Sequence, residues 1–197
     1  METTPLLPGN FYHIYNRGVN KEDVFKEERN YHYFLEQYQY YCSGVLETCA
    51  HALLKNHFHL LVYVAETAPV ARKDGKGLYQ PEATKQLSHF FNSYAQSINK
   101  AYNRTGQLFE SPFRRKEINN DAYLTSVIYY CHYNAQWHGF VQDFRNWPHS
   151  SYTAIRKQNK NWLAVDKVID WFGGRKQFEE AHTGMLNDSK MPDWWEE

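Results

Sequence analysis

The sequence predicts an α+β protein built around one antiparallel sheet, and three observations support this fold class. Stretches of alternating side chains, typical of strands, occur in turn with stretches whose apolar residues recur at helical spacing. Their order is strand, helix, strand, strand, helix, strand and a further helix. The first six elements form the ferredoxin-like β-α-β-β-α-β pattern, with helices on one face of the sheet. The chain of 197 residues is long enough for one domain with a good core, and a C-terminal helical extension follows.

The first four elements lie between residues 11 and 64. NFYHIYNRGVN predicts a strand that ends at Arg17-Gly18, because Phe11, His13 and Tyr15 alternate with Tyr12, Ile14 and Asn16. Aromatic and apolar residues at helical spacing predict a helix from Glu27 to about Ser43, before the stop signal Gly44. Two strands, Val45 to Leu54 and Phe58 to Val64, then form a hairpin around a tight turn at Lys55-Asn56.

The remaining elements follow a loop rich in Gly, Pro and charge, from Glu66 to Pro81. A helix is predicted from Glu82 to Tyr102. QLFESPFRRKEI is the fourth strand, and Pro112 indicates an edge or a bulge in it. NNDAYLTSVIYYCHYNAQ is the third helix, with Asn119, Asn120 or Asp121 as its cap. A further amphipathic stretch runs from Trp162 to Ala181.

Composition limits the possible functions only weakly. The chain has 22 basic and 22 acidic residues, a balance that does not favour nucleic-acid binding but leaves room for a local basic patch. Aromatic residues reach 17%, which suits either a core or stacking on unpaired bases. No segment has the ~18 apolar residues of a membrane span, and no signal peptide is evident. Three cysteines outside any metal-binding spacing predict a reduced, cytoplasmic protein with no membrane partner.

Two histidines interrupt the third strand, in the stretch LLKNHFHLLVYV. Side chains alternate along a strand, so His57 and His59 share one face, while Phe58 and Leu60 share the other. Two imidazoles on one face can bind a single divalent metal, and we expect them to be exposed ligands rather than core residues. A lone His-x-His is more often two polar positions on a half-exposed strand. A third ligand from elsewhere in the chain would favour the metal site.

The third helix offers such a ligand. At about 100° per residue its core face collects Leu124, Val127, Ile128, Cys131 and Ala135. Tyr130 and Asn134 are four residues apart on the flank of that face, where a phenol and an amide oxygen could reach a metal site on the sheet. On the helix alone, Tyr130 could just as well pack at the core margin. Tyr129 and Tyr133 fall nearly opposite the core and are expected to meet solvent.

These residues belong to a set that resembles a known family. NHFHLLV resembles the His-hydrophobic-His motif of HUH single-strand endonucleases, and YYCHYNAQWHGFV resembles a helix end of single-tyrosine transposases, especially the REP-associated tyrosine transposases. FYHIYNRGVNKEDVF, GQLFESPFRRKEI and WPHSSY resemble the opening strand, the fourth strand and a tail signature of that family. The resemblance extends from about Phe11 to Tyr152. One departure is Ala135, where the family usually has proline after the asparagine.

The resemblance implies roles for several residues. Tyr130 would be the nucleophile that forms a covalent 5′-phosphotyrosine, and His57, His59 and Asn134 would hold a divalent metal, Mg²⁺ or Mn²⁺. Imidazoles suit later transition metals better, so zinc or nickel could also occupy the site. Single-stranded or hairpin DNA would be the partner of a monomer or homodimer. Residues 1–141 would form the catalytic domain, and residues 142–197 a tail that packs on the domain or extends from it.

DNA contacts are expected from basic residues near these motifs. The candidates are Arg114, Arg115 and Lys116 on the fourth strand, Arg17 and Lys21 after the first strand, and, equally consistent with a solvated surface, Arg72, Lys73 and Lys76 in the long loop. Two other functions remain open. A domesticated DNA-binding protein could keep the fold without cleavage, and a metal-dependent phosphohydrolase could keep the tyrosine as a structural residue.

Overall fold

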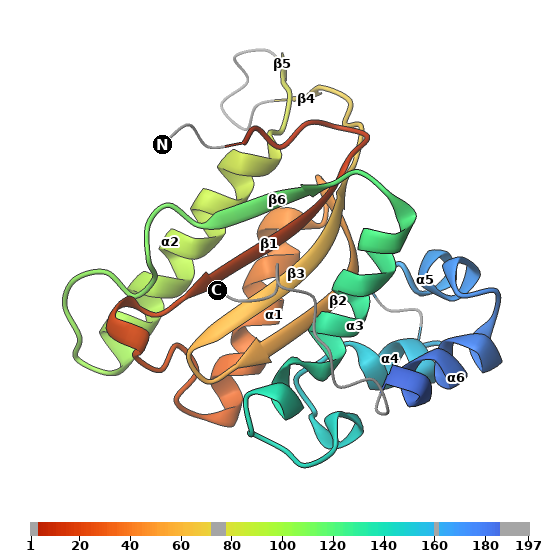
Figure 1. Ribbon diagram of the computed structural model, residues 1–197. Helices are drawn as coiled ribbons and strands as arrows, with labels where there is room; N and C mark the ends of the chain where they lie inside the picture. The colour runs from red at the N-terminus through yellow and green to blue at the C-terminus, as the bar shows by residue number, and fades with distance from the viewer. Residues whose placement is uncertain (1–3, 72–77, 160–161, 186–197) are drawn as a thin grey trace.

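The computed structural model describes residues 4–71, 78–159 and 162–185, and its centre is a four-stranded antiparallel sheet (Figure 1). The strand order is β2-β3-β1-β6. The strands are β1 (Phe11–Arg17), β2 (Leu46–Leu54), β3 (His57–Val64) and β6 (Arg114–Ile118). β2 and β3 form the predicted hairpin around Lys55-Asn56, and β1 lies between β3 and β6. This order and the antiparallel pairing confirm the predicted fold class.

Helices α1 (Glu28–Cys42) and α2 (Ala83–Ala101) pack side by side on one face of the sheet. The apolar stripe of each helix is buried there against Phe58, Leu60 and Val62 of β3. Phe34 of α1 and Phe90 of α2 meet in this core with their ring centroids 4.8 Å apart. Both helices of the β-α-β-β-α-β pattern therefore lie on the same face, as predicted.

Helix α3 (Asp121–Trp137) covers the opposite face over β2 and β3. Its cap is Asn120, whose side chain accepts a hydrogen bond of 2.8 Å from the backbone N–H of Tyr123. A second core lies between α3 and the alternate residues of the hairpin, with Leu54 and Leu61 packed near Val127. Because His57 and His59 share this face with Leu61, the position of α3 places its side chains next to the two histidines.

The described part of the C-terminal segment packs against β2 and α3. It contains η2 (Phe144–Asn146), α4 (Tyr152–Arg156), α5 (Val165–Trp171) and α6 (Arg175–Met185). Its backbone bonds to β2 at three points, one of which is the hydrogen bond of 2.9 Å from the N–H of Ser151 to the carbonyl of His51. These contacts place α4 to α6 beside the outer surface of α3 (Figure 1).

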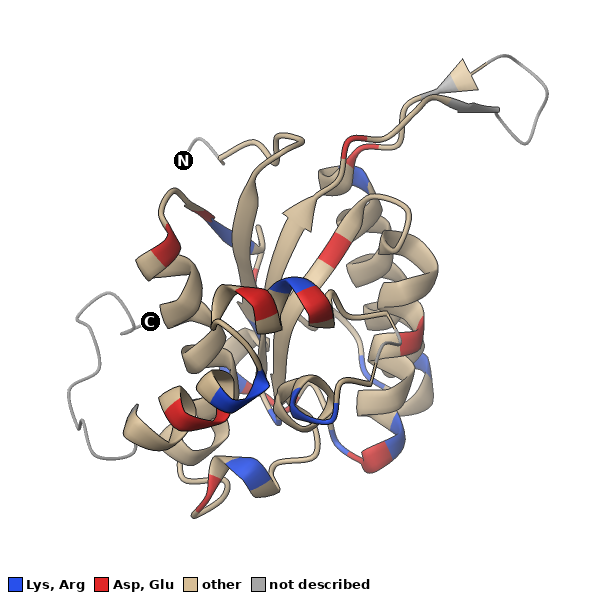
Figure 2. Cartoon of the chain, turned by 90° about the vertical axis from the view of Figure 1, so that its right-hand side faces the viewer, with Lys and Arg blue, Asp and Glu red and all other residues tan. Residues whose placement is uncertain are grey.

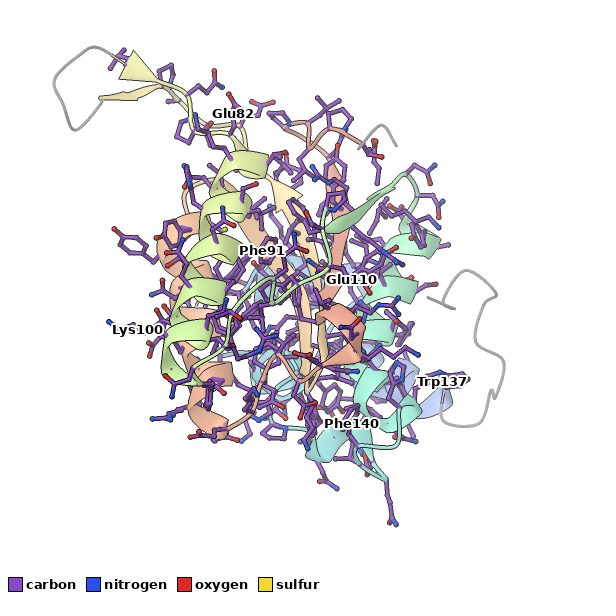
Figure 3. All side chains as sticks on the ribbon, turned by 90° about the vertical axis from the view of Figure 1, so that its left-hand side faces the viewer. Glu82, Phe91, Lys100, Glu110, Trp137 and Phe140 are labelled. Carbon is purple, nitrogen blue, oxygen red and sulfur yellow. The ribbon has the colours of Figure 1, made fainter. Side chains whose placement is uncertain are left out.

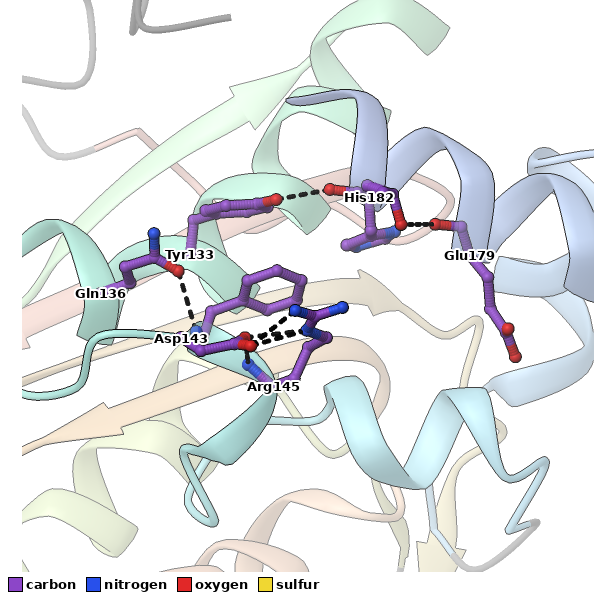
Figure 4. Close-up of polar contacts among 8 residues, drawn as sticks. Tyr133, Gln136, Asp143, Arg145, Glu179 and His182 are labelled. Atoms are coloured by element: carbon purple, nitrogen blue, oxygen red, sulfur yellow. Dashed lines mark hydrogen bonds and ion pairs between the residues drawn. The ribbon is translucent and has the colours of Figure 1, made fainter. Parts of the chain in front are cut away.

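The prediction that Tyr129 and Tyr133 meet solvent is only partly right, because both are half-buried where the C-terminal segment covers that side of α3. The ring of Tyr129 lies against Phe172 and His182, with centroid distances of 5.5 and 4.8 Å. The hydroxyl of Tyr133 donates a hydrogen bond to the carbonyl of His182 (Figure 4). A helical projection treats the side opposite the core as exposed, and it does not include later segments of the chain.

Three other segments differ from prediction in detail. The expected loop from residue 66 to 81 contains a short pair of strands, β4 (Val70–Ala71) and β5 (Leu78–Tyr79), whereas Arg72, Lys73 and Lys76 lie outside the described residues. β6 begins only at Arg114, after Pro112. A short helix η1 (Val19–Lys21) follows β1. No helix within the described ranges is both long and apolar enough to cross a membrane.

Candidate functional site

Four of the predicted site residues meet between β3 and α3. The Nε2 atom of His57 lies 3.0 Å from the Oδ1 atom of Asn134, and the Nε2 atom of His59 lies 3.5 Å from the hydroxyl of Tyr130. The rings of His57 and His59 are 5.2 Å apart at their centroids. The strand alternation and the four-residue spacing on the helix therefore bring two imidazoles, an amide and a phenol together, although they are up to 77 positions apart in sequence.

The remaining ring nitrogen of His57 is held by its neighbour. Its Nδ1 atom lies 2.7 Å from the Oδ1 atom of Asn56, so in the Nδ1–H tautomer the ring donates a hydrogen bond to that oxygen. In a neutral imidazole this leaves a lone pair on Nε2, which faces Asn134. Metal-binding histidines commonly donate their other N–H group to a nearby oxygen in this way.

His59 is held by a histidine of β1. Its Nδ1 atom lies 3.0 Å from the Nε2 atom of His13, and the two rings stack with centroids 5.2 Å apart. When His59 donates from Nδ1 to His13, its own Nε2 lone pair faces the hydroxyl of Tyr130. In this arrangement His13 accepts a hydrogen bond from Nδ1 of His59, as Asn56 does from Nδ1 of His57. Both predicted ligands then present Nε2 toward α3.

Burial keeps these imidazoles neutral. Desolvation lowers the pKa of His57 to about 4 and that of His13 to about 3, and it lowers the pKa of His59 well below the usual range. Only 7% of His57 and none of His59 is exposed, so the expectation of exposed ligands is wrong. Helix α3 closes over the strand at this point. The neutral state nevertheless leaves the lone pairs that metal binding requires.

The contact between His57 and Asn134 fits a bound cation. Two acceptor atoms, Nε2 and Oδ1, face each other at 3.0 Å, and the buried Nδ2 atom of Asn134 has no hydrogen-bond partner among the described residues. A separation of ~3 Å is also that of adjacent ligands on an octahedral ion with bonds of about 2.1 Å. The opposite amide orientation would let Nδ2 donate to His57 and would remove the need for an ion.

A metal site at this position needs the amide oxygen of Asn134 as its third protein ligand. Within the described residues, no three His, Cys, Asp or Glu side chains are placed to hold one metal ion. The available set is therefore two neutral imidazoles and the amide oxygen of Asn134, with other positions left for water or phosphate oxygens. This mixed set of nitrogen and oxygen ligands suits a divalent ion that accepts both better than it suits Mg²⁺, which favours oxygen ligands.

Sequence reasoning missed three residues of this site: His13, Asn56 and His138. The ring of His138, which follows α3, lies 4.8 Å from that of His57 at the centroids. A signal for His13 was present, because it alternates with Ile14 on a strand that a ferredoxin-like sheet places beside β3. The roles of Asn56 and His138 depend on the turn and on the helix end, whose side-chain directions have no periodic signal.

The structure divides the predicted basic cluster between the two faces of the sheet. Arg114 and Lys116 pair with Tyr15 and His13 of β1, so they are on the face of the candidate site, and both are exposed. Arg115 pairs with Ile14 and is on the α2 face, where its guanidinium group lies 4.0 Å from the ring centroid of Phe113. The three residues therefore cannot contact the same stretch of phosphates from one side.

Arg17 borders the candidate site, and Lys21 lies beyond it in η1. Arg17 is opposite His57 in the β1–β3 pairing and forms an ion pair of 2.6 Å with Glu110. The same carboxylate lies 3.5 Å from Arg114, so Glu110 joins two of the predicted DNA-binding residues. Lys21, in η1, is exposed.

Comparisons with known proteins agree with the motifs. A curated protein of Haemophilus influenzae, named as a REP-associated tyrosine transposase, is 24% identical over 141 residues, which is 66% of this chain and 76% of that protein. A solved REP-associated tyrosine transposase bound to a REP hairpin matches the fold with a TM-score of 0.60 and 12% identity. That match covers 84% of this chain and 89% of the other. No family model matches the chain. In sequence and in fold, the chain is similar to REP-associated tyrosine transposases.

Proposed function

We propose that the protein nicks single-stranded DNA and transfers the strand through a covalent tyrosine intermediate. The observation that carries this proposal is the approach of the Tyr130 hydroxyl to His59, beside the His57–Asn134 pair. The similarity to REP-associated tyrosine transposases supports it. By the same similarity, the DNA partner would be single-stranded or folded into a hairpin.

The proposed reaction exchanges one phosphoester bond for another. The phenolic oxygen of Tyr130 attacks the scissile phosphorus, and the bond from phosphorus to the 3′ oxygen breaks. The phenol loses its proton, and the 3′ oxygen leaves as a hydroxyl after gaining one. A phenol has an ordinary pKa near ~10, so its proton must be removed as the bond forms. Attack by another 3′ hydroxyl on the phosphotyrosine reverses these steps and joins a new strand.

The chain's own residues would prepare the metal ligands. His57, His59 and Asn134 would hold the ion, and Asn56 and His13 would keep the two rings in the tautomer that presents Nε2. When bound, a divalent ion stabilises charge on the scissile phosphate as a Lewis acid. The similarity favours Mg²⁺ or Mn²⁺. The two imidazoles favour Mn²⁺ over Mg²⁺.

The burial of the nucleophile favours a second candidate function. Only 4% of Tyr130 is exposed, so a phosphodiester reaches its hydroxyl only if neighbouring parts of the protein move. A DNA-binding protein that has lost cleavage would need no such movement. The two functions differ in one observable, which is the covalent bond between protein and DNA.

A denaturing gel with labelled hairpin DNA and Mn²⁺ tests the proposal. Wild type should give a covalent adduct, and Tyr130→Phe should give none while still binding DNA, because only the hydroxyl is lost. Tyr129→Phe is the matched control, since it removes a hydroxyl from the adjacent residue on the other side of α3 and should leave the adduct intact. An adduct in Tyr130→Phe would contradict the assignment. DNA binding without any adduct in wild type would favour the second candidate.

A further inference from the structure

A cavity lies on the sheet face opposite the candidate site, between α2 and the segment that precedes β6. Its volume is about 350 Å³, within the range of pockets that hold small ligands. Figure 3 faces this side of the molecule, with Phe91 on α2 and Glu110 on the neighbouring segment. None of the residues given roles in the proposed cleavage lines this cavity.

The inner wall offers flat surfaces. Phe91 and Phe113 line the cavity, with ring centroids 5.1 Å apart, and the guanidinium group of Arg115 lies over the ring of Phe113. Burial lowers the pKa of Arg115 from its usual range. The Nε atom of Arg115 is buried and has no hydrogen-bond partner among the described residues. A planar ligand could stack on these groups.

The polar residues at the opening of the cavity suit a nucleic-acid base better than a phosphate group. Two exposed carboxamides, Asn92 and Gln107, line the opening and can both donate and accept hydrogen bonds, as the edges of bases require. Glu110 also lines it, with its carboxylate in ion pairs with Arg17 and Arg114. Aromatic faces, carboxamides and one carboxylate together suit a neutral heterocycle.

The cavity is next to the predicted DNA-binding edge. Neighbouring residues of β6 point to opposite faces, so Arg114 is on the side of the candidate site and Arg115 is in the cavity. Glu110 forms ion pairs with Arg17 and Arg114 while lining the cavity. A single strand that crosses the edge at β6 would therefore meet phosphate-binding groups first and the cavity next.

We propose that this cavity binds one unpaired base of single-stranded DNA, which flanks the part of the strand that reaches Tyr130. This inference rests on the proposed function for the identity of the ligand. Stacking supplies affinity for any base, and the carboxamides of the rim supply a preference among bases. The cavity thus acts as a reader of sequence, separate from the residues that cleave.

Filling the cavity tests this inference. The probes are a random-sequence pool of single-stranded 12-mers and an abasic 12-mer with the same charge, both titrated by fluorescence anisotropy without metal. Ala95→Leu places an aliphatic side chain in the cavity, whereas Ala101→Leu makes the same change at an exposed position of α2 outside it. Ala95→Leu should weaken binding of the pool by about fivefold or more and leave binding of the abasic strand unchanged. Ala101→Leu should match wild type on both.

Asn92 lines the cavity and is exposed, so Asn92→Leu should also weaken binding of the pool. If circular dichroism shows that Ala95→Leu is unfolded, Asn92→Leu serves as the cavity variant in its place. Wild-type affinity of folded cavity variants for the pool would overturn the inference. An equal loss on both strands would overturn it as well, because the cavity would then hold phosphate. The Tyr130 adduct is scored separately, so failure of the proposed cleavage leaves the base-dependent binding measurable.

Discussion

At the scale of single residues, the direction of hydrogen bonds determines which atoms of the site can bind an ion. Strand periodicity was sufficient to place His57 and His59 on one face, and helix periodicity placed Tyr130 beside Asn134. Neither pattern shows which ring nitrogen points to the helix. That choice depends on Asn56 and His13, and His13 reaches His59 only through the pairing of β1 with β3.

Replacing His13 tests whether its Nε2 atom, as the acceptor for the Nδ1–H group of His59, positions that ligand. His13→Phe keeps a flat ring beside His59 but leaves Nδ1 of His59 without that partner, so Mn²⁺ affinity measured by calorimetry should fall about 10- to 100-fold. His13→Gln, whose amide oxygen can accept a hydrogen bond, should recover part of the loss. His32→Phe, at an exposed position of α1, is the control. Equal Mn²⁺ affinity in His13→Phe and wild type would show that His13 does not position the ligand.

At the scale of elements, a chain of buried hydrogen bonds attaches the C-terminal segment to α3. His182 donates from Nδ1 to the carbonyl of Phe178 at 2.7 Å, and its Nε2 atom lies 2.7 Å from Nδ1 of His132. The Nε2 atom of His132 lies 2.9 Å from the hydroxyl of Ser151, which accepts from the backbone of His51 at 3.0 Å. With all rings neutral, each donor in this chain has an acceptor. The order of elements was predictable from sequence, whereas this docking depends on side-chain contacts between residues that are 19, 50 and 100 positions apart.

The docking of α6 should weaken in acid. Burial lowers the pKa of His182 to about 4, against an ordinary value near 6.5, so between these values the unfolded chain binds a proton that the folded chain does not. Stability should therefore fall as the pH drops from about 6.5 toward 4, by up to about 1.4 kcal/mol per pH unit for this residue. Urea unfolding at pH 7.5, 6.5 and 5.5 measures the effect.

His182→Gln supplies the comparison. It should be less stable than wild type at pH 7.5, by about 1–3 kcal/mol, because buried partners lose their hydrogen bonds. Its stability should nevertheless depend less steeply on pH below 6.5. His89→Gln, which changes an exposed histidine of α2, should leave both quantities unchanged. A wild-type pH slope in His182→Gln would show that this histidine does not carry the acid sensitivity.

At the scale of the whole molecule, a net charge of zero requires local rather than global attraction to DNA. Figure 2 shows basic and acidic residues interspersed over the helices on the α3 side. The sequence identified the basic run of β6, and strand alternation alone separates Arg115 from Arg114 and Lys116. Which of the two faces carries the candidate site follows only from the pairing of β6 with β1. Lys116 and Arg114 are now the candidates for phosphate contacts near the site, and Arg115 is the candidate for contact with a base.

Salt dependence separates these roles. Lys116 is exposed on the face of the site, so Lys116→Ala should reduce the slope of log affinity against log salt by about 0.7 for single-stranded DNA. Arg114→Ala should reduce it less, because Glu110 already compensates part of that charge. Arg115→Ala should weaken binding of base-bearing strands with little change in slope, since its guanidinium group stacks on Phe113 within the cavity. Lys100→Ala, at the far end of α2, is the control for loss of one charge (Figure 3). If Arg115→Ala lowered the slope as much as Lys116→Ala, phosphates would run along both faces of β6, and the division of roles across this strand would be wrong.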